Sequence, residues 1–508
     1  MNEKDILKNL TLTRRDFLKG LAAAGLLGSL GPRWGSIGQG TTPKWDREAD
    51  VVVVGTGFAG LAAAIAAKDA GSDVLILEKM PVAGGNSVIA GGVYNCADPD
   101  RQIPMDIEDS TELHYTQTLA GGDFRGDPEK VRFMVENGLD GFHWLEEMGV
   151  TFPDWVMQIY GALYPRSHLP VGPEMYGTGI IKALLAQAES RGIPVLLEHK
   201  VSRIIREKTL EGRVLWVEVE AGGEMLSFKT KKALVLASGG FAANVEMRML
   251  HDRRLDASLG TTNHPGATGE CLMMAQNIGA NVTGMDYIQC VLGAYVEEIK
   301  GMLLGAFAGL DMVTAIFVNR EGKRFINEDA RRDEITEGAF KQPDKMWFTL
   351  EDSGEGGVPD PAEVEVLAGW KAGNILRADT LEELAVLCEM PADALVETTK
   401  TYNSYVDTKV DPDFGKAKWN LKRRIETPPF YASMVTPSVH HTMGGLVVKG
   451  TTGQVVDCWG EVIPGFYAAG EVTGGTHGTN RLGGNATLDC IVFGIACGEK
   501  AAAETSVS

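Results

Sequence analysis

Two histidines and an arginine stand between glycine-rich turns near the C-terminus of this chain. The stretch 439–445 reads Val-His-His-Thr-Met-Gly-Gly, and the stretch 475–485 reads Gly-Thr-His-Gly-Thr-Asn-Arg-Leu-Gly-Gly-Asn. An imidazole and a guanidinium can hold a carboxylate and polarise it as negative charge develops in a reaction. Arginine adds two parallel donors in a fixed geometry. The glycines indicate that the backbone closely approaches other atoms on both sides.

A second glycine motif lies near the N-terminus, in the stretch 55–60, which reads Gly-Thr-Gly-Phe-Ala-Gly. The apolar run 49–54 has the length of a strand, and the stretch 61–67 is typical of a helix. A dinucleotide-binding motif requires this strand–turn–helix context. Its glycines permit a tight turn, close approach to a pyrophosphate at the helix N-terminus, and close helix–strand packing. The motif residues are Gly55, Gly57, Ala59 and Gly60.

A second strand is expected at 73–77, and it ends in Glu78. A carboxylate at this place accepts hydrogen bonds from an adenosine ribose and repels a 2′-phosphate. The stretch 233–240 runs from an apolar strand into a glycine turn, which is typical of a sheet that returns beneath a nucleotide. These elements predict an α/β fold, and 508 residues are enough for two domains.

Together, the two glycine-rich ends resemble the flavoprotein subunits of the fumarate reductase/succinate dehydrogenase family, from about Ala49 to Ala502. Within that family the chain is similar to soluble flavocytochrome c fumarate reductases and urocanate reductases, without a haem domain. The resemblance implies a Rossmann-like FAD-binding domain in two parts, 45–288 and 439–505, with an inserted α+β capping domain at 289–438. Inside the capping domain, Thr380-Leu-Glu-Glu383 predicts the start of an amphipathic helix.

The resemblance also implies FAD as the cofactor, because the glycine-rich stretch 84–92 follows the second strand. Relatives with a covalent flavin place a histidine there, whereas this chain has Asn86, so non-covalent FAD is expected. The last helix is expected to begin near Asn485 and to direct its N-terminal dipole at the reduced flavin. Besides the motif at 55–60, the cofactor contacts implied by the resemblance are Glu78, Asn86, Ser87, Gly91, Gly92, Val201, Glu270, His441, Glu471, Ala486 and Thr487.

The reaction that the family implies is reduction of an activated C=C bond beside a carboxylate. In the resemblance, flavin N5 delivers hydride to the β carbon and Arg332 protonates the α carbon; the neighbouring Arg331 is the alternative donor. His440, Arg481 and the backbone of Gly484 would hold one substrate carboxylate. Because an arginine is normally always protonated, a proton relay must recharge it.

The sequence departs from fumarate reductases at the other end of the substrate. That family holds a second carboxylate with a histidine after an Ile-Gln pair and with a Thr-Glu pair. Here Cys290 follows Gln289, and the Thr-Glu positions hold Phe307 and Ala308. Burial of a carboxylate without donors is costly. We therefore expect a mono-carboxylate with an apolar or aromatic remainder, with Tyr295 supplying polar recognition. The candidates left open for the proton relay are Asp311, Glu328 and Asp333.

Residues 1–40 have the pattern of an export signal and linker. Twin arginines, followed by Asp, Phe, Leu and Lys, precede a mildly apolar stretch of 11 residues at 20–30, as in a twin-arginine signal. Such a stretch is too short for a stable membrane span, which needs roughly 20 residues. The expected location is the periplasm or the outer face of the cell.

The composition limits the partners. A formal net charge of −20 argues against nucleic acid, whose binding proteins carry a basic footprint. An acidic surface serves solubility or receives a basic redox partner. The seven cysteines form no CxxC, CxxCH or ferredoxin pattern, so metal, haem or iron–sulfur ligation by this chain is not expected. Electrons would come from a c-type cytochrome or a quinol-linked protein.

Several functions fit these observations. The leading hypothesis is an exported, FAD-dependent 2-enoate reductase, with fumarate reductase as its nearest alternative. An enone or 3-ketosteroid-type oxidoreductase on the same fold would use tyrosine acids rather than Arg332. The chain could also be a flavoprotein subunit that acts only with electron-carrying partners. A binding protein without activity is disfavoured, because the acid and the carboxylate-binding residues are all present.

Overall fold

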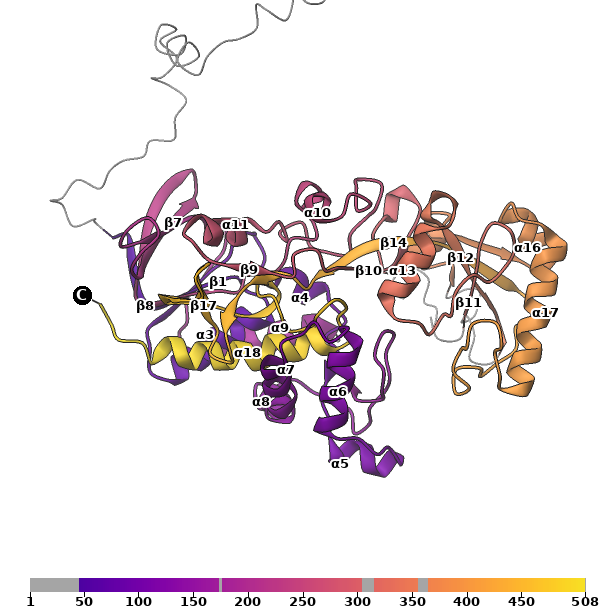
Figure 1. Ribbon diagram of the computed structural model, residues 1–508, viewed down its shortest axis with the longest axis horizontal. Coiled ribbons are helices and arrows are strands. Elements are labelled where there is room, and N and C mark those ends of the chain that lie inside the picture. The colour runs from indigo at the N-terminus through magenta and orange to yellow at the C-terminus, as the bar shows by residue number, and fades with distance from the viewer. Residues whose placement is uncertain (1–44, 173–175, 304–314, 355–363, 508) are drawn as a thin grey trace, which may run out of the picture. The chain divides into compact units, whose positions relative to one another are not determined.

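The nucleotide-binding half is built around parallel strands. The computed structural model (Figure 1) describes residues 45–172, 176–303, 315–354 and 364–507. Strand β1 (Arg47–Val54) pairs in parallel with β2 (Val74–Leu77) on one side and with β8 (Glu224–Leu236) on the other. The side chains of β1 alternate between two hydrophobic clusters on opposite faces of the sheet, as the period of a strand requires.

The sheet has the order β16–β17–β18–β8–β1–β2–β5, with β7 also paired to β8 and β6 paired to β7. The other strands of this half are β3 (Tyr94–Asn95), β4 (Ser167–His168), β5 (Val195–Leu196), β6 (Lys200–Arg206), β7 (Val214–Ala221), β9 (Val282–Thr283), β15 (Gly445–Leu446), β16 (Val448–Lys449), β17 (Gln454–Val456) and β18 (Val462–Ala468). Besides the two helices described next, its α-helices are α4 (Gly85–Ile89), α5 (Pro99–Gln102), α6 (Thr111–Gly121), α7 (Pro128–Glu136), α8 (Gly138–Glu147), α9 (Tyr176–Ser190), α10 (Val245–His251) and α11 (Glu270–Asn277).

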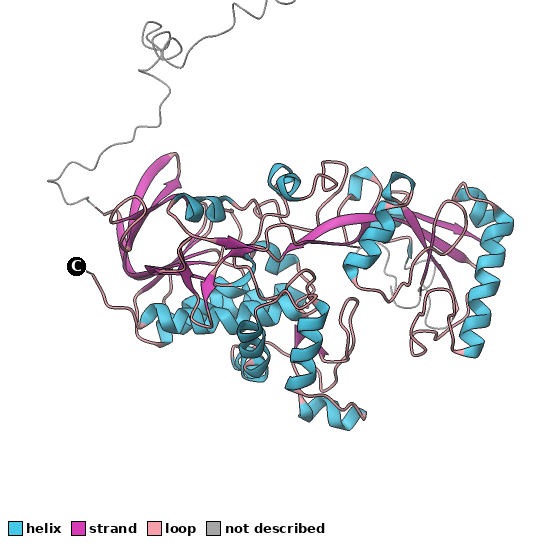
Figure 2. Ribbon diagram, viewed as in Figure 1, coloured by secondary structure: helices cyan, strands magenta, loops and turns pink. Residues whose placement is uncertain are grey.

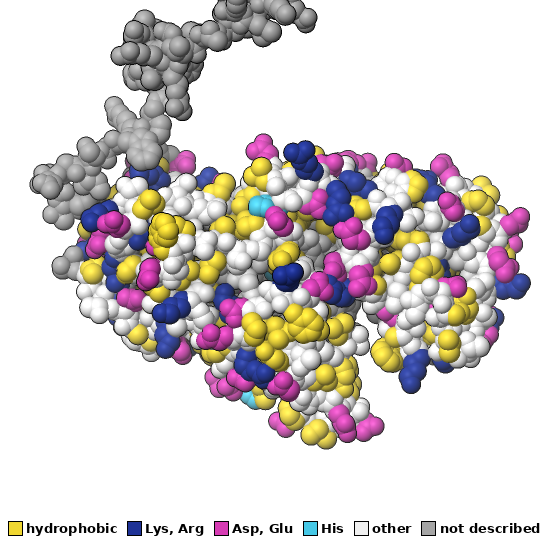
Figure 3. Space-filling view, in the orientation of Figure 1, with side chains coloured by type: hydrophobic (Ala, Val, Ile, Leu, Met, Phe, Trp, Pro, Cys, Tyr) yellow, Lys and Arg dark blue, Asp and Glu magenta, His cyan; other side chains and the backbone are white. Residues whose placement is uncertain are grey.

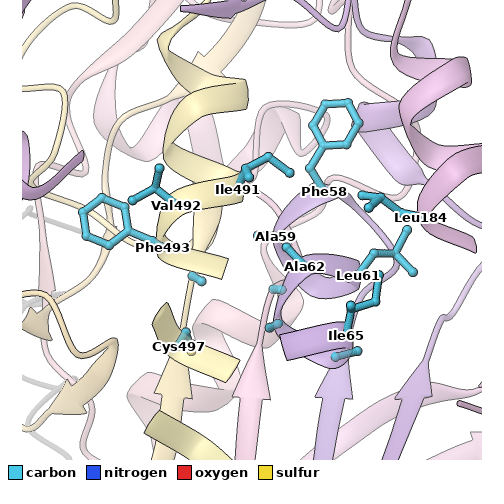
Figure 4. Packing of buried hydrophobic residues seen from close by; sticks show 14 of the residues in the cluster. Phe58, Ala59, Leu61, Ala62, Ile65, Leu184, Ile491, Val492, Phe493 and Cys497 are labelled. Carbon is cyan, nitrogen blue, oxygen red and sulfur yellow. The ribbon is translucent and has the colours of Figure 1, made fainter. Parts of the chain in front are cut away.

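Helices α3 (Phe58–Asp69) and α18 (Asn485–Ala502) bring the two ends of the described chain into one core (Figure 4). They approach closely because glycines face the backbone of α3. A Cβ on Gly494 would lie 2.8 Å from the carbonyl oxygen of Ala59, and one on Gly498 would lie 2.2 Å from that of Ala63. Because these pairs occur in the same order along both helices, the helices run parallel. Their positive N-terminal ends therefore face the same side of the sheet.

The inserted part is an antiparallel sheet of order β10–β14–β12–β11, with β13 also paired to β14. Helix α13 (Arg332–Phe340) packs on one face, and helices α16 (Leu381–Leu387) and α17 (Ala392–Thr408) pack on the other (Figure 2). The strands are β10 (Ile288–Ala294), β11 (Ile316–Val318), β12 (Trp347–Asp352), β13 (Ile375–Ala378) and β14 (Phe430–Thr442), and α15 spans Ala368–Lys371. We call this part the cap.

Strands β10 and β14 connect the cap to the nucleotide-binding half. They pair antiparallel, with Gln289 opposite His441 and Val291 opposite Ser438. The expected domain boundaries, after residues 288 and 438, therefore fall within these two strands. Consequently Gln289, His440 and His441 lie where the two parts of the chain meet.

Several sequence expectations are confirmed. The α/β fold with a parallel, Rossmann-like sheet is present, and the motif at 55–60 joins β1 to α3. Strand β2 ends at Leu77, directly before Glu78. The hydroxyl of Thr380 accepts a hydrogen bond from the amide of Glu383 at 3.1 Å at the start of α16. The last helix begins at Asn485.

Other expectations fall outside the described residues. The twin-arginine segment lies there, as do Phe307, Ala308 and Asp311. Among the residues that are described, no helix combines the length and the apolar character needed to cross a membrane. Figure 3 shows acidic and basic side chains intermixed on the face that it presents.

Candidate active site

The glycine motif and strand ends of the sheet line an open cleft. Gly55 has a φ of +109°, and a Cβ there would lie 2.3 Å from the carbonyl oxygen of Ala237. A Cβ on Gly60 would lie 2.0 Å from the carbonyl oxygen of Gly55. Larger residues are therefore excluded, and the backbone of this turn stays open at the N-terminus of α3. This arrangement suits the pyrophosphate of a dinucleotide.

Glu78 lies in the cleft and is tied to the glycine turn. It accepts hydrogen bonds from the hydroxyl of Thr56 at 2.6 Å, the amide of Thr56 at 3.2 Å and the amide of Met80 at 2.9 Å. The carboxylate is buried, so its position is fixed at the end of β2. Because a carboxylate oxygen accepts more than one hydrogen bond, Glu78 retains capacity for a ribose hydroxyl.

Glu270 also lines the cleft, but two lysines already pair with it. Lys79 and Lys200 each place Nζ 3.0 Å from one of its two carboxylate oxygens. Hydrogen bonds from Lys79 and Lys200 hold the pKa of Glu270 below its usual range despite partial burial. No local motif predicted this lysine pair, which adds positive charge to the cleft.

Asn86 and Ser87 stand at the start of α4, on the wall of the cleft. Ser87 Oγ accepts a hydrogen bond from the amide of Phe58 at 3.0 Å, which links α4 to the first turn of α3. Asn86 Oδ1 accepts from the amide of His264 at 2.7 Å, and its side-chain nitrogen donates to Asn263. These bonds fix the loop after β2.

Glu471 lines the cleft, and only 12% of its side chain is exposed. The amide of Thr442 donates to its Oε1 at 3.0 Å and the Thr442 hydroxyl donates at 3.1 Å. Burial raises the pKa of Glu471 above its usual value. His441 lies beside it, with Nδ1 3.7 Å from Oε1, and burial lowers the pKa of His441 so that the imidazole is neutral.

Not every predicted cofactor residue lies on the wall of this cleft. Those that do are Gly55, Gly57, Ala59, Glu78, Asn86, Ser87, Val201, Glu270 and Glu471; those that do not are Gly60, Gly91, Gly92, His441, Ala486 and Thr487. Gly92 faces another part of the protein, because a Cβ there would lie 2.5 Å from the amide of Gly177 at the start of α9.

The turn before α18 is held by Asn95, a residue that the sequence did not single out. Its amide group donates to the carbonyl oxygen of Gly483 at 2.6 Å and to Asn485 Oδ1 at 3.0 Å. Gly484 has a φ of +88°, and a Cβ there would collide with the Asn95 side chain. Ala486 and Thr487 lie in the first turn of α18 behind it. This turn therefore presents backbone rather than side chains.

Arg332 and Arg481 lie together, and both are almost fully buried, at 8% and 4% exposure. Each guanidinium donates to Oε1 of Gln289 at 3.2 Å. Gln289 is itself fixed, because its amide nitrogen donates to Asn480 Oδ1 and to the carbonyl oxygen of Arg481. Neither arginine has a carboxylate partner within ion-pair distance in the described part of the chain. Burial and the charge of Arg332 lower the pKa of Arg481 to about 9, and burial lowers the pKa of Arg332.

His440 adds a neutral donor to this pair. Burial, together with the charges of Arg481 and Arg332, lowers the pKa of His440 well below its usual value. Its Nδ1 lies 2.7 Å from the hydroxyl of Thr262. When that hydroxyl donates to Nδ1, the ring proton is on Nε2, which is then free to donate to an anion.

A loop of the nucleotide-binding half closes the site on another side. Arg332 Nη2 donates to the carbonyl oxygen of Tyr160 at 2.7 Å, and its guanidinium lies 5.2 Å from the centre of the Tyr160 ring. Gly161 has a φ of +76°, and a Cβ there would lie 2.4 Å from Nε of Arg332. The amide of Gly483 donates to the carbonyl oxygen of Gly161. Nothing in the local sequence indicated that this loop contacts Arg332.

Tyr295, expected at the substrate, lies elsewhere. Its side chain packs against the hydrophobic cluster under α16 and α17, whereas Tyr160 and α13 belong to the cluster on the other face of the cap sheet. The structure therefore does not bring Tyr295 to the arginine pair. Tyr295 directly follows Ala294, the last residue of β10, and successive side chains along a strand face opposite sides of its sheet.

Two of the acids considered for the proton relay to Arg332 form ion pairs with other cations. Glu328 accepts hydrogen bonds from Arg324 and lies 3.6 Å from Lys416 Nζ, deep in the cap. Asp333 accepts from Arg331, which points away from Arg332 and binds Asp123. The two neighbouring arginines are thus separated: Arg332 joins the buried site, and Arg331 joins a partly exposed ion pair.

Three comparisons with known proteins agree with this geometry. Residues 50–487 match the family described as FAD binding domain. The chain is 38% identical over 455 residues to the fumarate reductase (cytochrome) of Shewanella frigidimarina, which covers 89% of this chain and 77% of that protein. It is 36% identical over 466 residues to the urocanate reductase of Eggerthella lenta, covering 90% and 75%.

The acrylate reductase flavoprotein subunit of Shewanella woodyi is 32% identical over 513 residues, which cover 97% of this chain and 98% of that protein. Among solved structures, the open conformation of a flavocytochrome c3 fumarate reductase matches with a TM-score of 0.74 and 31% identity, over 96% of this chain and 81% of that one. FAD is therefore the cofactor that the cleft holds, and the glycine turn, Glu78 and the parallel helix N-termini fit its shape and charge.

Proposed function

Because this chain belongs to the family of FAD binding domain proteins, alongside flavoproteins that reduce the C=C bond of unsaturated acids, we propose that it reduces an α,β-unsaturated carboxylate. When bound, FAD supplies the hydride that adds to the carbon β to the carboxylate. The residues of this chain bind the acid, orient it, keep water away and supply the proton. The most specific form of the proposal is a mono-carboxylate whose remainder is apolar or aromatic.

One observation carries the proposal: two buried guanidiniums share a single neutral oxygen, that of Gln289. Unpaired buried charges are unfavourable. A substrate whose carboxylate binds Arg481 and whose α carbon lies beside Arg332 brings a negative charge to this pair and gains short, charge-assisted hydrogen bonds. An anionic substrate is therefore the ligand for which this arrangement is built.

In the proposed mechanism, Arg481 and His440 hold the substrate carboxylate. As hydride reaches the β carbon, negative charge moves onto the α carbon and the carboxylate, and both donors stabilise it. Arg332 then donates its proton to the α carbon. Burial lowers the pKa of Arg332, which makes it a stronger acid than an arginine in water. The Tyr160 carbonyl holds its guanidinium in place, and the absence of a side chain on Gly161 leaves room for it.

The described surroundings favour an apolar remainder. The cap cluster beside Arg332 consists of Leu292, Ile335, Phe325, Ile326, Tyr160 and other hydrophobic residues. Cys290, which stands where fumarate reductases have a histidine, is buried in a different hydrophobic cluster beside Val439. Fumarate stays the second candidate, because a fumarate reductase is 38% identical over most of the chain.

A substrate panel tests the proposal. The purified FAD-loaded enzyme, supplied with dithionite-reduced viologen, is given acrylate-, cinnamate- and urocanate-type acids and fumarate. We expect turnover with enoates and the highest kcat/KM for an acid with an apolar or aromatic remainder. A higher kcat/KM for fumarate would replace this substrate assignment with fumarate reduction. Absence of turnover with every acid would overturn the whole proposal.

Export is part of the proposal. The twin-arginine pattern at residues 14–15 supports a location outside the cytoplasm. An exported enzyme has no access to cytoplasmic NADH, so we propose that a c-type cytochrome or a quinol-linked protein supplies its electrons. Replacement of both arginines by lysine should retain the protein in the cytoplasm, as cell fractionation would show; unchanged export would contradict this assignment.

A further inference from the structure

Asp123 lies in the turn after α6, next to both segments that carry the buried arginines. Its backbone is left-handed, with a φ of +54°, a conformation that aspartate tolerates better than most residues. The carboxylate is half-exposed and accepts hydrogen bonds from Arg331 and from Thr479. We propose that Asp123 is a positioning residue, which sets the place of Arg332 relative to Arg481. This inference rests on the proposed function and deepens it.

The first contact of Asp123 reaches the cap. Arg331 Nη1 donates to Oδ1 at 2.6 Å, and Nη2 donates to Oδ2 at 3.0 Å. Such a two-bond pairing fixes orientation as well as distance. Arg331 is the residue directly before α13, whose first residue is Arg332. The Asp123 carboxylate therefore holds the start of this helix.

The second contact reaches the loop of Arg481. The hydroxyl of Thr479 donates to Asp123 Oδ2 at 2.6 Å. The same turn receives two more hydrogen bonds from this loop: the Thr479 amide donates to the carbonyl oxygen of Gly122, and the Asn480 side chain donates to that of Gly121, both at 3.1 Å. Asn480 in turn accepts from Gln289. One carboxylate thus joins the two segments whose guanidiniums meet at Gln289.

This role is distinct from stability. A half-exposed ion pair contributes little to the free energy of folding, so its loss leaves the protein folded. Arg331 also stays attached to α13, since it binds Asp333 in the first turn. Removal of the Asp123 charge therefore separates the start of α13 from the loop that carries Arg481. Arg331 itself stays bound to α13. A displacement of about 1 Å at reacting groups is enough to slow a reaction by up to about 100-fold.

Hydrogen bonds from Arg331 and Thr479 hold the pKa of Asp123 at about 2. The other charged groups near the pair are Asp333 and Glu334 on α13, with Glu334 4.0 Å from Arg331, and Arg125 beside Asp123. The ion pair of Asp123 and Arg331 consequently stays charged throughout the pH range of activity. It responds to ionic strength rather than to pH, because salt screens exposed charges.

The test uses Asp123→Asn, Arg331→Met, the double variant and Asp123→Glu in the FAD-loaded enzyme. We expect each single change to lower kcat about tenfold with little change in KM, because the carboxylate grip remains. The kcat of the double variant should be no lower than that of the slower single variant. Asp123→Glu should have a kcat between those of Asp123→Asn and wild type. Single variants with the wild-type kcat, or losses that multiply in the double variant, would overturn the proposal.

Glu112→Gln is the matched control. Glu112 forms an exposed pair with Arg132 on neighbouring helices α6 and α7, and neither touches the site. The Glu112→Gln variant should therefore have the kcat of wild type. Thr479→Val, which keeps the ion pair and removes one hydrogen bond, should give a smaller loss than Asp123→Asn.

Hydrogen–deuterium exchange of the substrate-free enzyme separates this inference from the proposed function. In Asp123→Asn, the amides in the first turn of α13 should exchange faster than in wild type, whatever acid the enzyme reduces. Faster exchange without any enoate turnover would retain the positioning role and overturn the proposed reaction. Unchanged exchange in an active enzyme would overturn the positioning role alone.

Discussion

Arg332 and Arg481 donate to the same atom, Oε1 of Gln289, each at 3.2 Å. Arg332 begins a helix of the cap, whereas Arg481 lies in a loop before the last helix of the nucleotide-binding half. Because the shared acceptor is neutral, the pair keeps a net positive charge inside the protein. That charge is the basis of the proposed binding of an acid, and it makes the role of Gln289 testable.

Gln289→Glu should place a carboxylate between the two guanidiniums. We expect a higher midpoint in urea unfolding, because the buried charges become paired, and a KM for the enoate about 10- to 100-fold higher, because the variant carboxylate competes with the substrate. Gln289→Met is the neutral control, since it removes the acceptor without adding charge. An unchanged KM in Gln289→Glu would contradict substrate binding at the arginine pair.

Arg332→Ala should lower kcat by about 10²- to 10⁴-fold, the range in which a general acid contributes. FAD content, measured from the flavin absorbance, should stay at the wild-type level because Arg332 does not line the cofactor cleft. Turnover is measured with reduced viologen. A loss of less than about fivefold would mean that another group supplies the proton.

Gly161→Ala tests the loop that holds Arg332. The added Cβ would lie 2.4 Å from Nε of Arg332, so the guanidinium must move, and we expect kcat to fall at least about tenfold. Gly149→Ala is a matched control: Gly149 also has a positive φ, +98°, but a Cβ there meets nothing within 4 Å. Equal losses in the two variants would indicate backbone strain rather than displacement of Arg332.

The flavin should be released by acid. Asn86 stands where a covalently bound flavin would need a histidine, so FAD is expected to be held by hydrogen bonds and packing alone. After precipitation with trichloroacetic acid, the supernatant should be yellow and the pellet colourless. A pellet that kept the flavin absorbance through repeated washing would show a covalent bond.

Asp489 should make stability depend on pH. It is buried on α18 and faces Thr476, His477, Lys130, Glu471 and Arg481. Burial raises the pKa of its carboxyl to about 7, from about 4 in an unfolded chain. Between these values the folded state binds the additional proton, so the contribution of Asp489 to the free energy of unfolding falls as pH rises from about 4 to about 7.

Urea unfolding of the FAD-loaded enzyme at several pH values measures this effect. Compared with wild type, the free energy of unfolding of Asp489→Asn should fall less, or rise more, between pH 4 and pH 7, because the amide does not titrate. The exposed Asp69→Asn on α3 is a suitable control and should leave the pH dependence as in wild type. The same pH dependence in Asp489→Asn and wild type would show that other groups cause it.

Local residue patterns were enough to predict several helices, strands and turns. The motif at 55–60 required a strand, a tight turn and a helix, because only glycine permits these backbone approaches, and all three are present. The capping signal at Thr380 and the start of the last helix at Asn485 are likewise local, since each depends on residues within one turn. Glu78 could be placed because it directly follows a strand of the parallel sheet.

Which side chains meet in the site depends on how distant parts of the chain pack together. Gln289 joins the two arginines because β10 and β14 pair at the junction of the two halves, and no local pattern determines that contact. The loop at Tyr160 and the turn at Asp123 reach the site from distant parts of the sequence. Tyr295 turned to the other face of the cap, since side chains of a strand alternate and the register depends on long-range pairing. The residue types predicted the chemistry. The residues come together in one site only because distant parts of the chain pack against each other.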